Sequence, residues 1–159
     1  MPLARESTTL HGSCHCGALR TEFTTRLSIA DMAPRACDCT FCQKHGAAYI
    51  SDSAGHLRIS VSDPETLHSY RQGSEAALFR LCARCGVLVA VTFAHKNRLF
   101  GAVNAGCLDD RASLAASVPA SPQRLSPEEK ISRWLQLWVP GVELVLGDSS
   151  KPTPLRGPA

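Results

Sequence analysis

The sequence has no long apolar segment and little net charge. No run of apolar residues approaches the roughly 18 that a membrane-spanning helix needs, and the polar first nine residues lack the apolar core of a secretory signal. Seventeen basic and fourteen acidic side chains leave a net charge of +3, too small and too dispersed to favour binding to nucleic acid. We therefore expect a cytoplasmic protein that binds neither membranes nor nucleic acid.

The composition is that of a folded protein. Hydrophobic residues make up 44% of the 159-residue chain, which is enough for a packed core and too much for wholesale disorder. The length fits one domain. We expect a flexible lead-in over residues 1–9, a single domain over residues 10–148, and a flexible, proline-containing tail over residues 149–159.

Apolar and polar residues alternate over residues 19–24 and 57–62, and short apolar runs follow later in the chain, which together predict a mainly β fold. A tight turn over residues 82–86 is expected to join two of the strands, and the stretch 117–127 is predicted to be a loop. The predicted strands span residues 19–24, 57–62, 76–81, 87–93 and 99–103.

One helix is predicted near the C-terminus. Ser126 is a suitable N-cap, Pro127 suits the first helical position, and Glu129 completes a capping box. Pro140 and the glycine after it are expected to end the helix. We expect its apolar side to pack on the sheet, and this side comprises Ile131, Trp134, Leu135 and Trp138.

Eight cysteines carry most of the functional information. They make up about 5% of the chain, below the roughly 8–10% of a disulfide-built secreted protein. In the reducing compartment expected here, clustered thiols bind metal more often than they form disulfides. The cysteines are Cys14, Cys16, Cys37, Cys39, Cys42, Cys82, Cys85 and Cys107.

Two cysteine pairs, each followed by a glycine, predict a structural zinc site. The segments are CHCG at residues 14–17 and CARCG at residues 82–86. In such a turn the glycine lets the backbone bring both sulfur atoms to one side. Together the pairs supply four thiolates, which is the closed tetrahedral set of a structural zinc. Such an ion would join distant parts of the chain, so its binding energy would contribute to folding.

The segment CDCTFC at residues 37–42 supplies three thiols within six residues. A zinc ion held by three protein ligands keeps an open position for chemistry, and the spacing favours this interpretation. Two alternatives remain open at this point: closure of the site by Cys107, His45 or another histidine, or a redox disulfide within the segment. Lys44 and His45 lie just past this segment, and we expect them to be surface residues rather than parts of the site.

Four segments resemble the glutathione-dependent formaldehyde-activating enzyme family, which includes the centromere protein V group. The first three are GSCHCGA at residues 12–18, CDCTFCQK at 37–44 and RLCARCG at 80–86. The fourth, VNAGCLDD at 103–110, resembles the segment with which the family's domain typically nears its end. Thr40 departs from the usual serine but keeps the hydroxyl group. Cys107 stands where a thiol is unusual, and we expect it to act as a small buried apolar residue.

The resemblance implies a zinc-stapled β-barrel or sandwich similar to the Mss4-like barrels, to which the predicted C-terminal helix is added. It also implies two Zn²⁺ ions, one structural and one catalytic, of which the second need not be fully occupied. The structural ion would be bound by Cys14, Cys16, Cys82 and Cys85. The catalytic ion would be bound by Cys37, Cys39 and Cys42.

The implied activity is that of a carbon–sulfur lyase that forms or cleaves an S-hydroxymethyl adduct. Its partners would be glutathione or another small thiol, and formaldehyde or another small aldehyde. A metal ion that holds both reactants suits such a reaction, because proximity contributes much of the rate. The alternative is a non-catalytic, zinc-stabilised module that carries glutathione or binds another protein.

Overall fold

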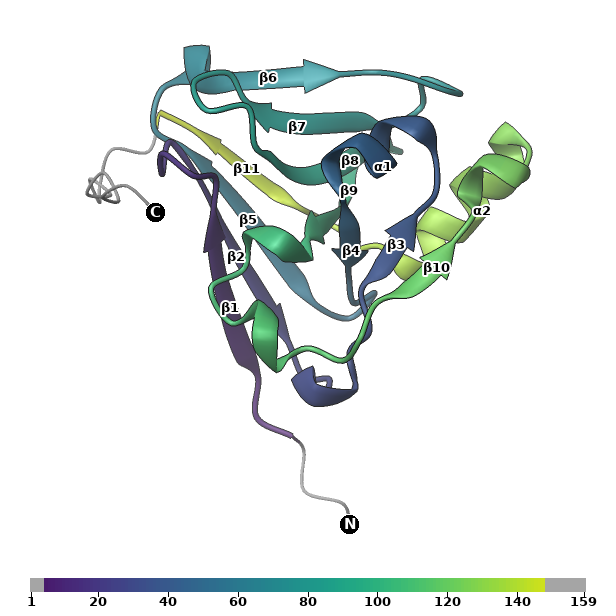
Figure 1. The fold of residues 1–159 in the computed structure, drawn as a ribbon, viewed down its shortest axis with the longest axis horizontal. Coiled ribbons are helices and arrows are strands. Elements are labelled where there is room, and N and C mark those ends of the chain that lie inside the picture. Colours follow the sequence, from purple (N-terminus) through teal and green to yellow (C-terminus); the bar gives the residue numbers. More distant parts are fainter. Residues whose placement is uncertain (1–4, 148–159) are drawn as a thin grey trace.

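Two β-sheets and two α-helices make up the computed structural model, which describes residues 5–147 (Figure 1). The smaller sheet has the order β1-β2-β5-β11, and the larger sheet has the order β10-β3-β4-β9-β8-β7-β6. The mainly β fold expected from the sequence is therefore confirmed. Within residues 5–147 no helix has both the length and the apolar character needed to cross a bilayer. The predicted tail over residues 149–159 lies outside the described residues.

The smaller sheet contains two strands that the sequence predicts and two that it does not. Its strands are β1 (Thr8–Ser13), β2 (Leu19–Thr25), β5 (His56–Val61) and β11 (Glu143–Leu146). Strand β2 alternates strictly between buried and half-buried residues, as its sequence predicts. Strand β1 begins inside the stretch expected to be a lead-in. Its signal is weak because among its apolar positions only Leu10 is large and buried.

The larger sheet confirms the central strands predicted from the sequence. Its strands are β3 (Arg35–Cys37), β4 (Ala48–Ile50), β6 (Leu67–Tyr70), β7 (Leu78–Cys82), β8 (Leu88–His95), β9 (Arg98–Asn104) and β10 (Val118–Ala120). Strands β7, β8 and β9 form an antiparallel meander. Strand β10 lies within the predicted loop. It is an edge strand parallel to β3, and an edge position tolerates its proline.

Helix α2 (Pro127–Leu137) begins as predicted, and Ser126 and Glu129 form the capping box. It ends three residues before Pro140, because Val139 exchanges two backbone hydrogen bonds with Gly101 of β9. A proline also disfavours the helical conformation in the residue before it. Helix α1 (Thr40–His45) was not predicted, since six residues are too few to display a helical period.

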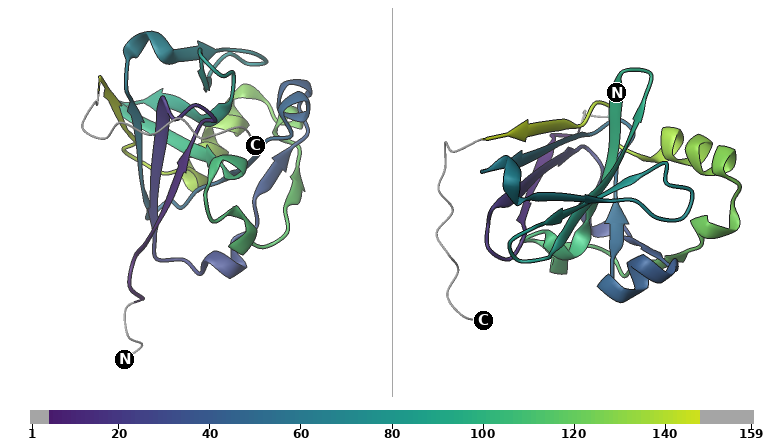
Figure 2. Two further views of the ribbon diagram at one scale, coloured as in Figure 1. Left: turned by 60° about the vertical axis from the view of Figure 1, so that its left-hand side comes forward. Right: turned by 90° about the horizontal axis from the view of Figure 1, so that it is seen from above.

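The larger sheet lies between the smaller sheet and helix α2 (Figure 2). It separates two apolar clusters. Side chains of both sheets fill the first cluster, which contains Phe23 and Ile59 of the smaller sheet and Val103 of the larger one. The second cluster lies on the other face of the larger sheet, between β8, β9 and helix α2. There Phe93 contacts the rings of Trp134 and Trp138, with centroids 5.2 and 5.6 Å apart. The apolar side of α2 thus packs on the sheet as expected.

Candidate functional site

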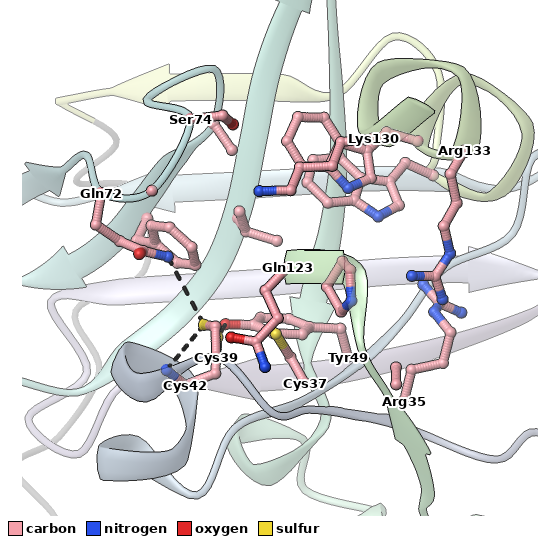
Figure 3. A pocket seen from close by; sticks show the side chains of 18 of the residues that line it. Arg35, Cys37, Cys39, Cys42, Tyr49, Gln72, Ser74, Gln123, Lys130 and Arg133 are labelled. Carbon is pink, nitrogen blue, oxygen red and sulfur yellow. Dashed lines mark hydrogen bonds between the residues drawn. The ribbon is translucent and has the colours of Figure 1, made fainter. Parts of the chain in front are cut away.

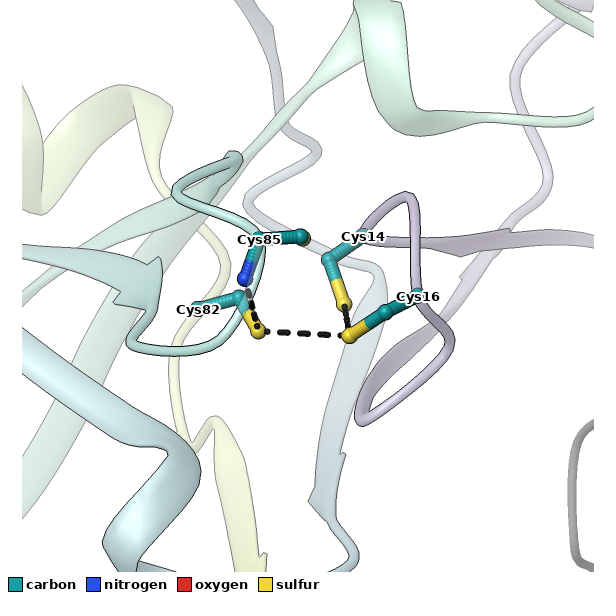
Figure 4. Close-up of side chains that lie close together, drawn as sticks. All are labelled: Cys14, Cys16, Cys82 and Cys85. Atoms are coloured by element: carbon teal, nitrogen blue, oxygen red, sulfur yellow. Dashed lines mark hydrogen bonds between the residues drawn. The ribbon is translucent and has the colours of Figure 1, made fainter. Parts of the chain in front are cut away.

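Two cysteine pairs that are far apart in the sequence meet between the two sheets (Figure 4). Cys14 and Cys16 lie in the turn from β1 to β2, whereas Cys82 and Cys85 lie where β7 turns into β8. The Sγ atom of Cys16 is 3.7 Å from that of Cys14 and 3.6 Å from that of Cys82. Sulfur atoms around a tetrahedral zinc ion at about 2.3 Å lie about 3.8 Å apart. This four-cysteine cluster therefore fits such an ion.

The backbone of both turns is arranged to stabilise thiolates. The amide of Leu19 donates to the Sγ of Cys14 at 3.3 Å, and the amide of Cys85 donates to the Sγ of Cys82 at 3.4 Å. Gly17 and Gly86, which follow the second cysteine of each pair, both have a φ of 82°. Only glycine adopts this left-handed conformation at little cost. The two turns thus use one geometry, as their shared pattern indicates.

Cys107 lies beside the four-cysteine cluster but does not join it. Its thiol donates a hydrogen bond to the carbonyl oxygen of Leu88 at 3.2 Å. Burial raises the pKa of Cys107 to about 12, and the nearby Cys85 adds to the effect. The side chain is half-buried, and it remains far less acidic than an ordinary thiol. Cys107 is therefore a neutral thiol at physiological pH.

The other three cysteines form a second cluster around the start of α1. Cys37 ends β3, Cys39 is the N-cap of α1, and Cys42 lies within the helix. Their sulfur atoms all lie within 4.8 Å of one another, and the amide of Cys42 donates to the Sγ of Cys39 at 3.4 Å. In the part of the chain that is described, no fourth cysteine, histidine or carboxylate joins this three-cysteine cluster.

The residues considered as a fourth ligand lie elsewhere. His45 is exposed at the end of α1, with its ring 4.7 Å from that of Phe41, and Lys44 is exposed beside it. Asp38 lies between two of the cysteines, but its carboxylate accepts a hydrogen bond from the Ser121 hydroxyl at 2.5 Å. The cysteines of the cluster are free thiols. Within residues 5–147, neither Cys107 nor His45 therefore completes the three-cysteine cluster, and no disulfide forms within it.

Two polar side chains that sequence reasoning missed contact the three-cysteine cluster. The Oη atom of Tyr49 in β4 is 3.2 Å from the Sγ of Cys42. The amide nitrogen of Gln72 donates to the Sγ of Cys39 at a longer distance, 3.7 Å. A turn separates Tyr49 from Cys42 in the chain, and Tyr49 belongs to no sequence motif that would predict this contact. Only the fold brings these residues to the cluster.

The sulfur atoms of the cluster differ in acidity. A hydrogen bond from the Cys42 thiol lowers the pKa of Cys37 to about 6, against the opposing effect of burial. The same bond, together with burial, raises the pKa of Cys42. Burial and the adjacent thiols also raise the pKa of Tyr49. The phenol therefore stays protonated and is the donor whenever Cys42 is a thiolate.

The three-cysteine cluster lines a pocket of about 300 Å³ (Figure 3). All three cysteines contribute to the lining, together with Tyr49 and Phe79. The opposite wall is formed by Trp134 of helix α2 and by Trp138, the C-cap of that helix; their rings stack with centroids 4.7 Å apart and planes 19° apart. A small molecule in this pocket can therefore reach the cysteine sulfur atoms from a largely apolar environment.

The pocket is also lined by three cationic side chains, those of Arg35, Lys130 and Arg133. Arg35 in β3 donates to the Ser51 hydroxyl at 2.7 Å, and burial followed by the charge of Arg133 lowers its pKa. Within residues 5–147, no aspartate or glutamate lines the pocket. These cations were not among the predicted site residues, although the spacing of Lys130 and Arg133 on one helix offered a signal.

Two comparisons relate the chain to known proteins. The sequence model of a family described as glutathione-dependent formaldehyde-activating enzyme matches residues 9–125. The matched range contains both cysteine clusters but not helix α2. The crystal structure of a Rhodobacter sphaeroides protein is also similar, with a TM-score of 0.50 and 28% sequence identity. The similarity covers 67% of this chain and 99% of that chain.

Proposed function

Because the chain belongs to the glutathione-dependent formaldehyde-activating enzyme family, we propose that it is a carbon–sulfur lyase acting on an S-hydroxymethyl adduct. The thiol is glutathione or a similar small thiol, and the aldehyde is formaldehyde or another small aldehyde. In the forming direction the thiol sulfur bonds to the carbonyl carbon, the C=O double bond becomes a single bond, and the thiol proton ends on the oxygen. In the cleaving direction these steps are reversed, and nothing is oxidised or reduced.

We assign Zn²⁺ to both cysteine clusters, which could each hold a metal ion. The four-cysteine cluster offers a closed set of sulfur ligands and has the structural role. The three-cysteine cluster, formed by Cys37, Cys39 and Cys42, offers three ligands and has the catalytic role. When bound there, Zn²⁺ would lower the pKa of a thiol and polarise the carbonyl oxygen of an aldehyde.

The residues around the three-cysteine cluster have distinct tasks in this proposal. Tyr49 and Gln72 donate hydrogen bonds to sulfur ligands, which keeps the ligands oriented. The aromatic wall of α2 excludes water from the reactants. The pocket holds thiol and aldehyde in contact, which converts a bimolecular encounter into a reaction between neighbours. A reducing compartment such as the cytoplasm suits a site built from free thiols.

One observation carries the proposal: the side of the three-cysteine cluster that lacks a protein ligand coincides with a pocket. The test compares Cys39→Ser with the control Cys107→Ser, which removes a thiol outside both clusters. Exchange NMR measures how fast glutathione and formaldehyde interconvert with their adduct, relative to buffer. We expect Cys39→Ser to lose the acceleration and Cys107→Ser to retain it.

An unchanged rate in Cys39→Ser would contradict the proposal. If the wild-type protein binds glutathione in calorimetry but accelerates neither direction of the reaction, the protein is instead a non-catalytic carrier. Metal analysis under reducing conditions accompanies both measurements. We expect about two zinc ions per wild-type chain and one in Cys39→Ser, because the four-cysteine cluster is intact in that variant.

A further inference from the structure

The pocket beside the three-cysteine cluster has a positively charged end. Arg35 and Cys37 are two residues apart in β3, so both side chains lie on one face of the strand with Cα atoms about 6.6 Å apart. On the opposite wall, Lys130 and Arg133 are one turn apart on α2 and face the same side. Figure 3 shows the guanidinium groups of Arg35 and Arg133 next to one another.

These cations have no acidic partner in the described part of the chain. No carboxylate among residues 5–147 forms an ion pair with Arg35, Lys130 or Arg133. The hydrogen-bond partner of Arg35 is the neutral hydroxyl of Ser51, which in turn donates to the carbonyl oxygen of Leu137. This arrangement fixes the guanidinium group but leaves its charge unbalanced.

Unbalanced like charges in a half-buried site are unfavourable, because the surroundings screen them less than water does. Proteins usually pair such charges, and the position opposite these three is the pocket itself. A planar guanidinium group presents two parallel N–H groups that match a carboxylate. The missing counter-charge is therefore that of a bound ligand.

The charges of the residues that line the pocket also indicate which kind of carboxylate fits. An α-amino acid group carries an ammonium beside its carboxylate, and an ammonium needs an acceptor such as aspartate or glutamate. No such residue lines the pocket within the described chain. A carboxylate without a neighbouring ammonium is the better match. In glutathione, the glycyl carboxylate is of this kind and the γ-glutamyl carboxylate is not.

We propose that Arg35, Lys130 and Arg133 form a carboxylate subsite that binds the glycyl end of the thiol substrate and orients its sulfur toward the three-cysteine cluster. This inference rests on the proposed function, since it names the part of that substrate which the site recognises. Two of the three cations lie on α2, beyond residue 125 where the family match ends. Most of the subsite thus comes from the C-terminal segment of this chain, and the subsite makes carboxylate-bearing thiols the substrate class.

The test uses S-methylglutathione, whose sulfur cannot form a thiolate, so that its binding measures the subsite without the metal chemistry. Calorimetry compares the wild type, Arg133→Gln and Lys130→Gln with Arg124→Gln, an exposed arginine outside the pocket lining. We expect each pocket variant to weaken binding about tenfold, in line with the loss of one charged hydrogen bond. The control should bind as the wild type does, and added salt should weaken wild-type binding.

A second comparison isolates the glycyl carboxylate. The glycyl ethyl ester of S-methylglutathione should bind the wild type about tenfold more weakly than the free acid, and this ester penalty should be smaller in Arg133→Gln and in Lys130→Gln. Equal binding of ester and acid to the wild type overturns the proposal, as does an ester penalty that persists undiminished in both pocket variants.

The two proposals fail in different ways. If the predicted binding pattern holds but no adduct formation is accelerated, the subsite stands and the lyase activity does not. If adduct formation is accelerated equally for glutathione and its glycyl ester, the activity stands and the subsite is refuted.

Discussion

The phenolic oxygen of Tyr49 lies 3.2 Å from the sulfur of Cys42, and both side chains are buried. Strand β4 supplies the phenol and helix α1 supplies the thiol, so this contact ties the three-cysteine cluster to the larger sheet. Partners of metal-binding residues often determine how strongly the metal is held. The contact therefore yields a direct test of the metal site.

Tyr49→Phe should weaken metal binding at the three-cysteine cluster by about tenfold, because the thiolate of Cys42 loses its hydrogen-bond donor. Competition with a chromophoric chelator measures the affinity, and the visible spectrum of the Co²⁺-substituted protein should shift. Tyr70→Phe is the matched control, since Tyr70 is 43% exposed and contacts Phe41 rather than a cysteine. An unchanged affinity and spectrum in Tyr49→Phe would show that the phenol does not act on the metal site.

The two cysteine clusters should contribute very differently to stability. The four-cysteine cluster joins the turn between β1 and β2 to the turn between β7 and β8, and so links the two sheets. Cys14→Ser should therefore lower the thermal unfolding midpoint by well over 10 °C or prevent folding, since structural zinc sites contribute folding energy outright. Cys39→Ser should lower the midpoint by only a few degrees. Comparable midpoints for the two variants would refute this division of roles.

Alkylation of the metal-free three-cysteine cluster should depend on pH in a distinctive way. The pKa of Cys37 is lowered to about 6, so its reactive thiolate is present above that pH and is lost as the pH falls below it. Iodoacetamide should modify Cys37 at pH 7 much faster than Cys107, whose pKa is raised to about 12. Peptide mass spectrometry gives the rate at each thiol. A half-maximal rate near pH 9 at Cys37 would contradict the assignment.

The capping box of α2 should stabilise the pocket wall. Ser126→Ala removes the hydroxyl that accepts from the Glu129 amide at 3.2 Å, and should lower the free energy of unfolding by about 1 kcal/mol. Urea denaturation measures the loss. Ser132→Ala on the exposed side of the same helix is the control, and alanine there should be neutral or slightly stabilising. Equal effects of the two substitutions would mean that the cap contributes little.

Local patterns in the sequence predict most of the framework. Alternation of apolar and polar residues identified β2 and β5, and apolar runs identified β8 and β9. The serine, proline and glutamate at its start identified α2. The grouping of seven cysteines into two clusters follows from their spacing. The missed strands are short or polar: β10 has three residues including Pro119, and β11 has four. Their pairing depends on distant partners that no local pattern reveals.

The contents of the pocket were harder to predict than its cysteines. Tyr49, Gln72 and Arg35 reach it from three separate strands or loops, and each is an ordinary residue in its own segment. Arg80 is a further example: it is 8% exposed and donates to Thr92 and Ser69 inside the larger sheet. Side chains such as these acquire their roles only from tertiary proximity.

Helix α2 is flanked by two strands, and these strands belong to different sheets. Strand β10 precedes it and pairs with β3, whereas β11 follows it and pairs with β5. A chain truncated just before Glu143 would keep every cysteine yet release one anchor of the aromatic wall. The proposed carboxylate subsite therefore requires a longer stretch of the chain than the two proposed metal sites do.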